Sequence, residues 1–334
     1  MPSPTALITG ISGQDGSYLA ELLLAKGYAV FGTSRRGAQA ARSENLRPIG
    51  DSLTIIAADP GTPRWAEQTL AQLRSRPDEI YHLAAETFVP RSWEQPLETA
   101  DNIALGTLRL LEAVRREAPG VRVLVAGSSA MFGDPMETPQ RESTPFRPLD
   151  PYSAAKAFAH TVTGQYREVH GLYAVGAMLF NHESPRRSPE FVTRKISLAV
   201  ARIAQGDTTP LTIGSLDARR DWGFAGDYVD AMWRALQAAQ PNDYVVGTGV
   251  THSVREFCER AFAAAALDYR AHVIFDERFF RRSDDRVLVA DWARAREVLG
   301  WAPRTSFDQL VKMMVEADVT RAAALPRATL TPNA

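Results

Sequence analysis

The chain has very little cysteine and no long hydrophobic run, and both shortages narrow the class of protein. Cys258 is the one cysteine among 334 residues, which excludes a disulfide within the chain and a structural zinc site built on several cysteines. Its context, VREFCERAFAAA, has helical spacing, so we expect a small buried apolar residue. No apolar run reaches the ~18–20 residues that a membrane span needs. The segment MPSPTALITG lacks a charged region before its apolar residues, so we expect no signal peptide and a cytoplasmic protein.

An excess of charge of either sign is also missing. Lys and Arg number 38 and Asp and Glu 39, which leaves a net charge of −1 with histidine neutral. Such a balance gives no electrostatic attraction to nucleic acid or to an anionic membrane, and we expect neither as a partner. The length allows about two domains or one large one.

Short apolar runs alternate with helical patterns in the first half of the chain. The runs lie at residues 6–8, 29–32, 53–57, 80–84, 121–126 and 174–180, with amphipathic stretches such as 17–25 and 107–117 between them. Near-continuous apolar strands that alternate with helices predict a parallel sheet covered on both faces. We therefore predict an α/β fold, a doubly wound parallel sheet (Rossmann) with a smaller mixed α/β substrate-binding domain. Such sheets bind ligands at the carboxyl ends of their strands.

The regular alternation ends after residue 180, where prolines separate shorter elements. We predict helices at 194–205 and 227–237, and strands at 211–213 and 244–247. We assign a dinucleotide-binding domain to residues 1–180 plus about 220–248, and a second domain to 181–219 and 249–324. Residues 325–334 have two prolines and no periodicity, so we expect a mobile tail.

A glycine-rich segment, TGISGQDG, lies between the first predicted strand and the first predicted helix. Its glycines, Gly10, Gly13 and Gly16, allow a tight turn and a close approach of the backbone to a pyrophosphate. The N-terminus of the helix then supplies free N–H groups and a partial positive charge. In this position the segment predicts a dinucleotide site rather than a plain turn.

The second predicted strand ends in the sequence TSRR. A site for NAD usually has an acidic side chain here on the ribose 2′-hydroxyl, whereas arginines can bind a 2′-phosphate through charge-assisted hydrogen bonds. Arg35 and Arg36 therefore predict NADP(H), unless they form only a solvated basic loop. Asp59 ends the third strand, either as a partner for the adenine amino group or as a turn residue before Pro60.

The segment YSAAK has the spacing YxxxK at the start of a predicted helix. Asp150 is a suitable N-cap and Pro151 a suitable first helical residue, so Tyr152 and Lys156 share one helix face. A free phenol has a pKa of about 10, and we expect the nearby ammonium and a positive nicotinamide ring to lower it, so that Tyr152 can act as a base. Ser128 follows the fifth strand, where it could bind a substrate oxygen beside Tyr152 or cap a turn.

These motifs, in this order and at these distances, resemble the extended short-chain dehydrogenase/reductase superfamily. Longer segments are similar to the GDP-mannose 4,6-dehydratase family, namely FNHESPRR at 180–187, FVTRKI at 191–196, DARRDWG at 217–223, GWAPRT at 300–305 and MMVEAD at 313–318. The resemblance runs from about residue 5 to residue 321, and these segments are far more specific than the glycine motif.

The resemblance implies a set of site residues and no metal. The catalytic residues it implies are Ser128, Tyr152 and Lys156. It implies an NADP(H) site made by Gly10, Gly13, Gln14, Asp15, Gly16, Arg35, Arg36, Asp59, Leu83, Ala84, Ala85, Tyr152, Lys156, His182 and Arg187. It implies contacts to a GDP-hexose from Thr87, Ser129, Asn181, Lys195, Arg220, Arg281 and Asp284. From the residues alone, His182 could equally be a structural histidine. Arg219 and Arg220 could instead pair with Asp217 or Asp221 at the surface.

The main departure from the family pattern concerns one carboxylate. The family has Thr-Ser-Glu after the fifth strand, where this chain has Ser128, Ser129 and Ala130. In the family, Tyr and NADP oxidise C4 of the hexose, the glutamate takes the C5 proton and helps to expel the C6 hydroxyl, and the hydride returns to C6. General acid–base help is worth roughly 10²–10⁴-fold per proton transfer, so Ala130 should slow the elimination severely. In addition, Glu86 stands where the family has Gln, and RSDDR at 282–286 replaces a Pro-Ala-Glu-Val-Asp segment.

We therefore expect an NADP(H)-dependent enzyme of nucleotide-sugar metabolism that transfers a hydride at C4 of a GDP-hexose. Its simplest form is a GDP-4-keto-6-deoxymannose 4-reductase. One alternative is a GDP-mannose 4,6-dehydratase in which Glu86, Asp134 or water replaces the glutamate, and another is a GDP-sugar epimerase. A non-catalytic protein that binds NADP or a sugar nucleotide is favoured by Ala130 and disfavoured by the intact Ser128, Tyr152 and Lys156.

The resemblance also bears on assembly. The helices predicted at 99–116 and 152–170 are long and have apolar faces, and members of the superfamily commonly pair such helices into a dimer. The family's arginine loop near Arg35 reaches a neighbouring subunit, which would make a tetramer. We expect a homodimer or a homotetramer.

Overall fold

A sheet of seven parallel strands forms the centre of the larger part of the molecule. The computed structural model describes residues 3–276 and 286–324, and the strands follow the order β10-β6-β5-β4-β1-β2-β3. Their bounds are β1 Thr5–Thr9, β2 Ala29–Ser34, β3 Thr54–Ala57, β4 Glu79–His82, β5 Arg122–Ala126, β6 Ala174–Leu179 and β10 Tyr244–Val246. All six residues of β6 are buried, as expected for a strand with both faces covered. The predicted Rossmann-type α/β fold is confirmed.

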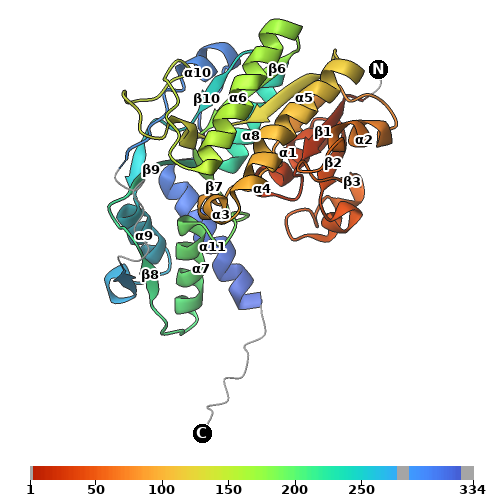
Figure 1. Cartoon of the computed structure of the whole chain (residues 1–334). Coiled ribbons are helices and arrows are strands. Elements are labelled where there is room, and N and C mark those ends of the chain that lie inside the picture. The colour runs from red at the N-terminus through yellow and green to blue at the C-terminus, as the bar shows by residue number, and fades with distance from the viewer. Residues whose placement is uncertain (1–2, 277–285, 325–334) are drawn as a thin grey trace.

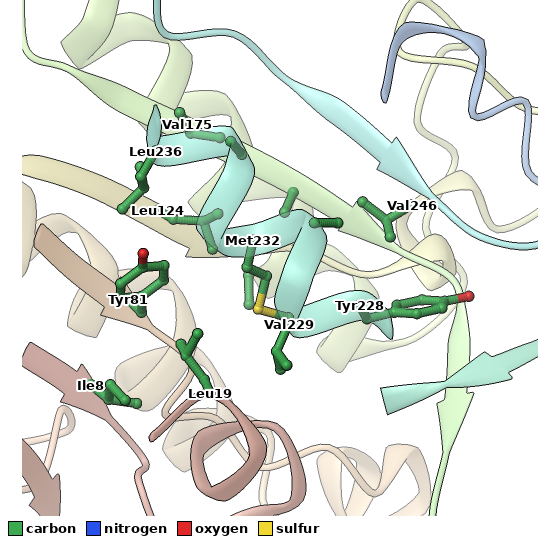
Figure 2. Packing of buried hydrophobic residues seen from close by; sticks show 14 of the residues in the cluster. Ile8, Leu19, Tyr81, Leu124, Val175, Tyr228, Val229, Met232, Leu236 and Val246 are labelled. Atoms are coloured by element: carbon green, nitrogen blue, oxygen red, sulfur yellow. The ribbon is translucent and has the colours of Figure 1, made fainter. Parts of the chain in front are cut away.

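Helices cover both faces of this sheet (Figure 1). One layer consists of α1 Gln14–Ala25 and α8 Ala225–Gln237, and the other of α2 Trp65–Gln72, α5 Gly106–Glu117 and α6 Pro151–His170. Figure 2 shows the first layer, in which Met232 and Leu236 of α8 pack among Leu124 and Val175 of the sheet. These side chains are all buried, so removal of apolar surface from water holds α8 to the strands. Within the described residues, no helix is both long and apolar enough to cross a membrane.

The helix predicted at 99–116 is interrupted in the structure. After α3 Val89–Glu94, the chain forms α4 Pro96–Ala100 and a π-helical turn at Asp101–Leu105, and only then α5. Gly106, at the start of α5, lies against Pro60, and a Cβ there would come within 2.8 Å of Pro60 Cβ. The absent side chain thus permits a close approach that helical periodicity alone does not predict.

In the smaller part of the molecule, the described residues form two small sheets, three α-helices and a short 3-10 helix at Tyr269–Ala271. The sheets are β11-β9-β7 and β12-β8, with bounds β7 Asn181–Glu183, β8 Leu211–Ile213, β9 Arg219–Phe224, β11 Thr251–Ser253 and β12 Val273–Phe275. The helices are α7 Val192–Ala204, α9 Val254–Ala263 and α11 Phe307–Ala324, which lie together below the large sheet in Figure 1. They share a core around Trp222 and Phe257. Cys258 is fully buried in this core, as predicted, and burial raises the pKa of its thiol to about 12.

Later segments of the chain return to the large sheet. β10 and α8 pack there, and so does α10 Ala293–Leu299, which contacts both of them. The indole of Trp301, fully buried behind α10, donates a hydrogen bond of 2.8 Å to the carbonyl of Asp227. The proposed domain boundary put α10 with the second domain, so this packing differs from it. The tail predicted to be mobile, 325–334, lies outside the described residues.

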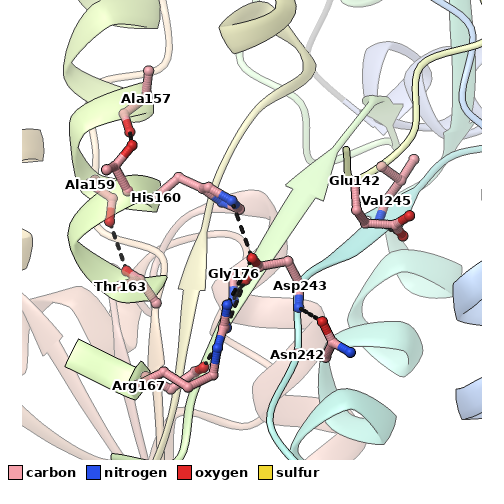
Figure 3. A network of polar contacts seen from close by, with 12 residues as sticks. Glu142, Ala157, Ala159, His160, Thr163, Arg167, Gly176, Asn242, Asp243 and Val245 are labelled. Atoms are coloured by element: carbon pink, nitrogen blue, oxygen red, sulfur yellow. Dashed lines mark hydrogen bonds and ion pairs between the residues drawn. The ribbon is translucent and has the colours of Figure 1, made fainter. Parts of the chain in front are cut away.

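One partly buried ion-pair network anchors α6 to the edge of the sheet. Figure 3 shows Asp243, just before β10, facing Arg167 and His160 of α6. Both guanidinium Nη atoms of Arg167 donate to its carboxylate at 2.9 Å, and the N–H of Gly176 in β6 donates at 3.1 Å. Burial alone would raise the pKa of Asp243, but the hydrogen bonds and charges of His160 and Arg167 hold it well below its usual range. The network therefore fixes the helix that begins with the YxxxK segment.

Candidate active site

A cavity of about 390 Å³ lies at the carboxyl edge of the large sheet, and we call it the cofactor cavity. Its lining includes most of the residues that the resemblance assigns to NADP(H). They are Gly10, Gly13, Gln14, Asp15, Gly16, Arg35, Arg36, Asp59, Leu83, Ala84, Ala85 and Arg187. Thr87 and Glu86 line it as well.

The glycine loop has the geometry of a phosphate cradle. Gly10 has φ +71°, and a Cβ on it would lie 2.9 Å from the Cα of Ala84. A Cβ on Gly16 would lie 2.5 Å from the carbonyl oxygen of Gly10, so neither position accepts a larger residue. Gly13 is the N-cap of α1 and has no side chain to occupy the N–H groups of the first turn. A cradle of backbone N–H groups at a helix N-terminus fits the pyrophosphate of a dinucleotide.

The two arginines after β2 are exposed on the rim of the cofactor cavity. Arg35 and Arg36 are thus available to a phosphate on the adenosine ribose. Asp59 lines the cavity, and its carboxylate also accepts the N–H of Gly61 at 3.0 Å. The turn role of Asp59 is therefore present in the structure, and a contact to adenine stays a prediction.

A buried pair that sequence reasoning missed holds the loop after β4. The hydroxyl oxygen of Thr9 accepts the N–H groups of Leu83 at 3.0 Å and Ala84 at 3.1 Å, so its own proton is directed to Nδ1 of His82 at 2.9 Å. Burial lowers the pKa of His82 to about 3, which keeps the ring neutral as that arrangement requires. Thr9 and His82 are register partners at the ends of β1 and β4. Polar residues at the ends of two apolar strands are the signal that could have revealed them.

A second cavity, of about 230 Å³, adjoins the first, and we call it the substrate cavity. It brings together residues from distant parts of the sequence that the resemblance assigns to catalysis and to the sugar nucleotide. Those that line it are Thr87, Ser128, Ser129, Tyr152, Lys156, Asn181 and Arg220, and His182, which the resemblance assigns to NADP(H), lines it as well. Asp15, Leu83, Thr87 and Arg187 line both cavities, so the two are continuous.

The start of α6 holds the phenol and the amine as predicted. Asp150 caps the helix by accepting the N–H of Ser153 at 2.8 Å, and Pro151 occupies the first turn. Tyr152 and Lys156 follow and are both buried. The ammonium of Lys156 donates to the carbonyl oxygen of Ala126, at the end of β5, at 2.6 Å. The helix thus places both side chains at the carboxyl edge of the sheet.

The acidities of this pair differ from what the sequence predicts. Burial raises the pKa of Tyr152, and the hydrogen bond from Ser128 and the charge of Arg187 oppose that rise without cancelling it. The prediction of a lowered phenol pKa is therefore wrong for the protein's own groups. Burial also lowers the pKa of Lys156 to about 8, so a part of the Lys156 side chains is already neutral slightly above neutral pH.

His182 lies in the site and contacts two hydrogen-bond acceptors. Its Nδ1 lies 2.7 Å from the carbonyl oxygen of Phe180 and its Nε2 lies 2.8 Å from a carboxylate oxygen of Asp15. Because both partners accept hydrogen bonds, this arrangement favours a proton on each ring nitrogen. Burial would lower the pKa of His182, but the Asp15 carboxylate outweighs it and raises that pKa. This ion pair joins the glycine loop to β7.

Some predicted substrate residues lie elsewhere. Lys195 is exposed on α7, outside the lining of both cavities, while Arg281 and Asp284 fall outside the described residues. The sequence left open a surface ion pair of Arg219 or Arg220 with Asp217 or Asp221. In the structure, Arg219 instead lies 3.5 Å from the carboxylate of Glu256. Arg220 lines the substrate cavity.

The wall of the substrate cavity around residue 130 is apolar. Ala130 packs with Val89 and Ala85 against the cluster that includes the ring of Tyr152. Neither proposed substitute carboxylate lies in that wall. Glu86 lines the cofactor cavity, where its oxygens accept the N–H groups of Thr87 and Phe88 and bind Arg91 at 2.8 Å.

Asp134, the other proposed substitute, forms an ion pair of 2.9 Å with Arg286. Arg286 itself lines the substrate cavity, as do Leu288, Phe191, Val89 and Asp150, all of which sequence reasoning left out. The exchange of the family's Asp for Arg at the end of RSDDR was the available signal for Arg286. Among residues 3–276 and 286–324, no group of three or more His, Cys, Asp or Glu side chains is arranged to hold a metal ion.

Comparison with known proteins agrees with this geometry. A family model described as GDP-mannose 4,6 dehydratase matches residues 7–314. A protein named GDP-mannose 4,6 dehydratase 1, from Arabidopsis thaliana, is 47% identical over 335 residues, which are 95% of this chain and 90% of the relative. The GDP-mannose 4,6 dehydratase of Homo sapiens is 41% identical over 344 residues, 95% of this chain and 92% of that protein. Among solved structures, RMD from Pseudomonas aeruginosa complexed with NADPH has a TM-score of 0.79 at 24% identity, over 96% of this chain and all of that one.

Proposed function

Since the chain belongs to the GDP-mannose 4,6-dehydratase family, we propose that it is an NADP(H)-dependent enzyme that transfers a hydride at C4 of a GDP-hexose. The observation that carries this proposal is the position of Ser128, Tyr152 and Lys156. They line one cavity that is continuous with the glycine cradle. A binding protein without catalysis would not require this trio.

The residues present fit NADP(H). The glycine loop would hold the pyrophosphate, and Arg35 and Arg36 would bind the 2′-phosphate through charge-assisted hydrogen bonds. When bound, NADP(H) accepts or supplies the hydride. The phenol oxygen of Tyr152 exchanges a proton with O4 of the hexose, and the hydroxyl of Ser128 donates a hydrogen bond to the same oxygen. Lys156, protonated below about pH 8, supplies the positive charge that stabilises a phenolate.

The relatives' names support dehydration of GDP-mannose as the first reaction to test. That reaction needs a group that removes the C5 proton and another proton for the departing C6 hydroxyl. Glu86 and Asp134 pair with Arg91 and Arg286, so a dehydratase of this chain would use water or another group of the substrate cavity, such as the Asp150 carboxylate or the Ser129 hydroxyl.

Reduction of a GDP-4-keto-6-deoxyhexose is the second candidate, and two observations favour it. The side chains that pack with Ala130 are apolar, and such a surface suits a C6 methyl group. Burial raises the pKa of Tyr152, which favours the protonated phenol that a ketone reduction consumes.

Two matched reactions separate these candidates. The protein with NADP⁺ and GDP-mannose is analysed by mass spectrometry for a product that has lost one water. The protein with NADPH and GDP-4-keto-6-deoxymannose is followed by the near-ultraviolet absorbance of NADPH. Catalytic loss of water without net NADPH oxidation identifies the dehydratase, and stoichiometric NADPH oxidation identifies the reductase. Sugar isomers without either change would indicate an epimerase, and binding without any turnover would refute the proposed hydride transfer.

We also propose that the chain self-associates through α3 to α6. Large apolar side chains on these elements are exposed, namely Trp93, Leu97, Leu105 and Phe158. An exposed apolar group of this kind marks interaction surfaces. Sedimentation as a single 36.7 kDa species at micromolar concentration would contradict this proposal.

A further inference from the structure

A buried carboxylate outside both cavities joins three segments of the chain behind the substrate cavity. Asp221 lies on β9 and is 1% exposed. Its neighbour Arg220 lines the substrate cavity. Because successive side chains of a strand point to opposite faces, Asp221 points away from the cavity while its neighbour points into it.

All the hydrogen-bond partners that the described residues give this carboxylate are uncharged. One oxygen accepts the N–H of Thr248 at 2.9 Å and its hydroxyl at 2.6 Å. The other accepts the N–H of Gly249 at 2.9 Å and that of Ala290 at 3.1 Å. Four donors from two separate loops thus converge on one side chain of β9. Burial raises the pKa of Asp221, and these hydrogen bonds oppose the rise.

The bond to Ala290 connects this cluster to the substrate cavity. Ala290 belongs to the segment 286–292, in which Arg286 and Leu288 line the cavity. Gln140 fixes the other side of this segment, because its N–H donates to the carbonyl of Val289 and its side-chain oxygen accepts the N–H of Val289, both at 2.8 Å. One wall of the cavity is therefore held between Gln140 and Asp221.

Close packing leaves this junction little room to adjust. A Cβ on Gly247 would lie 2.3 Å from the Cβ of Ala290 and 3.1 Å from a carboxylate oxygen of Asp221. Gly249 has φ +77°, a conformation that side chains rarely adopt. Gly247 and Gly249 let the loop after β10 approach the carboxylate closely enough for the N–H groups of Thr248 and Gly249 to donate to it.

We propose that Asp221 is a positioning residue for the substrate cavity. It holds the segment 286–292 against β9, so that the wall carrying Arg286 and Leu288 stands beside Arg220. Its atoms contact neither substrate nor cofactor. The sugar-nucleotide assignment of the cavity rests on the proposed function, whereas the mechanical role of Asp221 does not.

The substitution Asp221→Asn tests this role with almost no change in size. An amide keeps one acceptor oxygen but turns an NH₂ group toward two of the donors, so two hydrogen bonds are lost. Asp217→Asn is the matched control, because Asp217 is four residues earlier, exposed, and paired with Arg255 at the surface. Thr248→Val removes one donor and leaves the carboxylate, and it serves if Asp221→Asn does not fold.

The first measurement is hydrogen exchange, which needs no ligand. Peptides covering 247–250 and 286–292 should exchange faster in Asp221→Asn than in the wild type, and the increase should be smaller in Thr248→Val. Peptides of β1 should exchange at the wild-type rate in both variants. In the control Asp217→Asn, all of these peptides should exchange at the wild-type rate. The second measurement is binding. The Kd for GDP-mannose should rise about tenfold in Asp221→Asn, because binding would then have to order the loosened segment 286–292, with the Kd for NADPH unchanged.

Exchange at 286–292 equal to that of the wild type would overturn the positioning role. Equal loss of both affinities together with faster exchange in every peptide would show a general structural role instead. If the wild type fails to bind GDP-mannose while the exchange result holds, the proposed substrate is wrong and the positioning role of Asp221 stands.

Discussion

The cofactor cavity and the substrate cavity adjoin, yet they are built in different ways. The cofactor cavity consists mainly of loops that directly follow β1, β2, β3 and β4, and its shape depends on backbone conformation at Gly10 and Gly16. Two of its cations, Arg35 and Arg36, are exposed. The substrate cavity takes its lining from segments between residues 15 and 288, and one of its cations, Lys156, is buried.

This difference shows where a change of chemistry is easiest. A substitution in the glycine cradle meets backbone atoms at under 3 Å and disturbs the fold, whereas residue 130 is a side chain on a cavity wall. The hydride-transfer trio can therefore persist while the elimination carboxylate is absent. Under the proposed function, the scaffold would hold the residues for hydride transfer in place, while elimination would depend on the side chain at position 130.

The sharpest test of the comparison removes the phenol oxygen from the substrate cavity. Tyr152→Phe should lower turnover by roughly 10²–10⁴-fold, the worth of one proton transfer, because the proposed function assigns to the Tyr152 phenol the proton exchange with O4. Binding of NADPH in the cofactor cavity should be unchanged, as measured by fluorescence titration. Turnover close to that of the wild type would show that Tyr152 is not the proton donor and acceptor.

The next test restores a carboxylate to the apolar wall. Ala130→Glu should raise the rate of water loss from GDP-mannose by roughly 10²-fold or more, because a general base would then face the sugar. Ala130→Gln has the same length and no ionisable group, so it should leave that rate at the wild-type level. Mass spectrometry of the nucleotide sugar gives both rates. Equal rates for the two variants would mean that the position does not control elimination.

The fold could be predicted from the sequence because its signals are local. Apolar runs gave the strands from β1 to β6, and the Asp-Pro pair at 150–151 gave the start of α6. The break in the helix at 101–105 and the return of α10 to the large sheet could not be predicted. Both depend on contacts between distant segments, such as Pro60 with Gly106 and Trp301 with Asp227.

The candidate site follows the same rule. The glycine loop, Arg35 and the YxxxK pair were found from the sequence because spacing along one loop or helix determines them. The role of Arg286 was missed because it depends on a segment that docks onto Gln140 from far along the chain. The pKa of Tyr152 was predicted with the wrong direction because burial, which the sequence does not state, outweighs the neighbouring charge.

The exposed cations of the cofactor cavity should affect affinity alone. Replacing both Arg35 and Arg36 by Ala should weaken NADPH binding by roughly 10–100-fold, the worth of a charge-assisted hydrogen bond or two. NADH lacks the 2′-phosphate, so its Kd should not change. Calorimetric titration with both cofactors gives the ratio, and equal weakening for NADH would show that the arginines act on the fold of the loop.

The buried cation of the substrate cavity should instead appear in stability as a function of pH. The pKa of Lys156 is about 8 in the folded protein, against an ordinary 10.5, so the unfolded chain binds more protons between these values. Unfolding then costs more as pH rises, and the free energy of unfolding of the wild type should increase relative to Lys156→Met by about 1–2 kcal/mol between about pH 8 and pH 10. Denaturant titrations at both pH values give this difference. If the free energies of unfolding of the wild type and Lys156→Met change equally with pH, the Lys156 ammonium is solvated. The two cavities would then not differ in the burial of their cations.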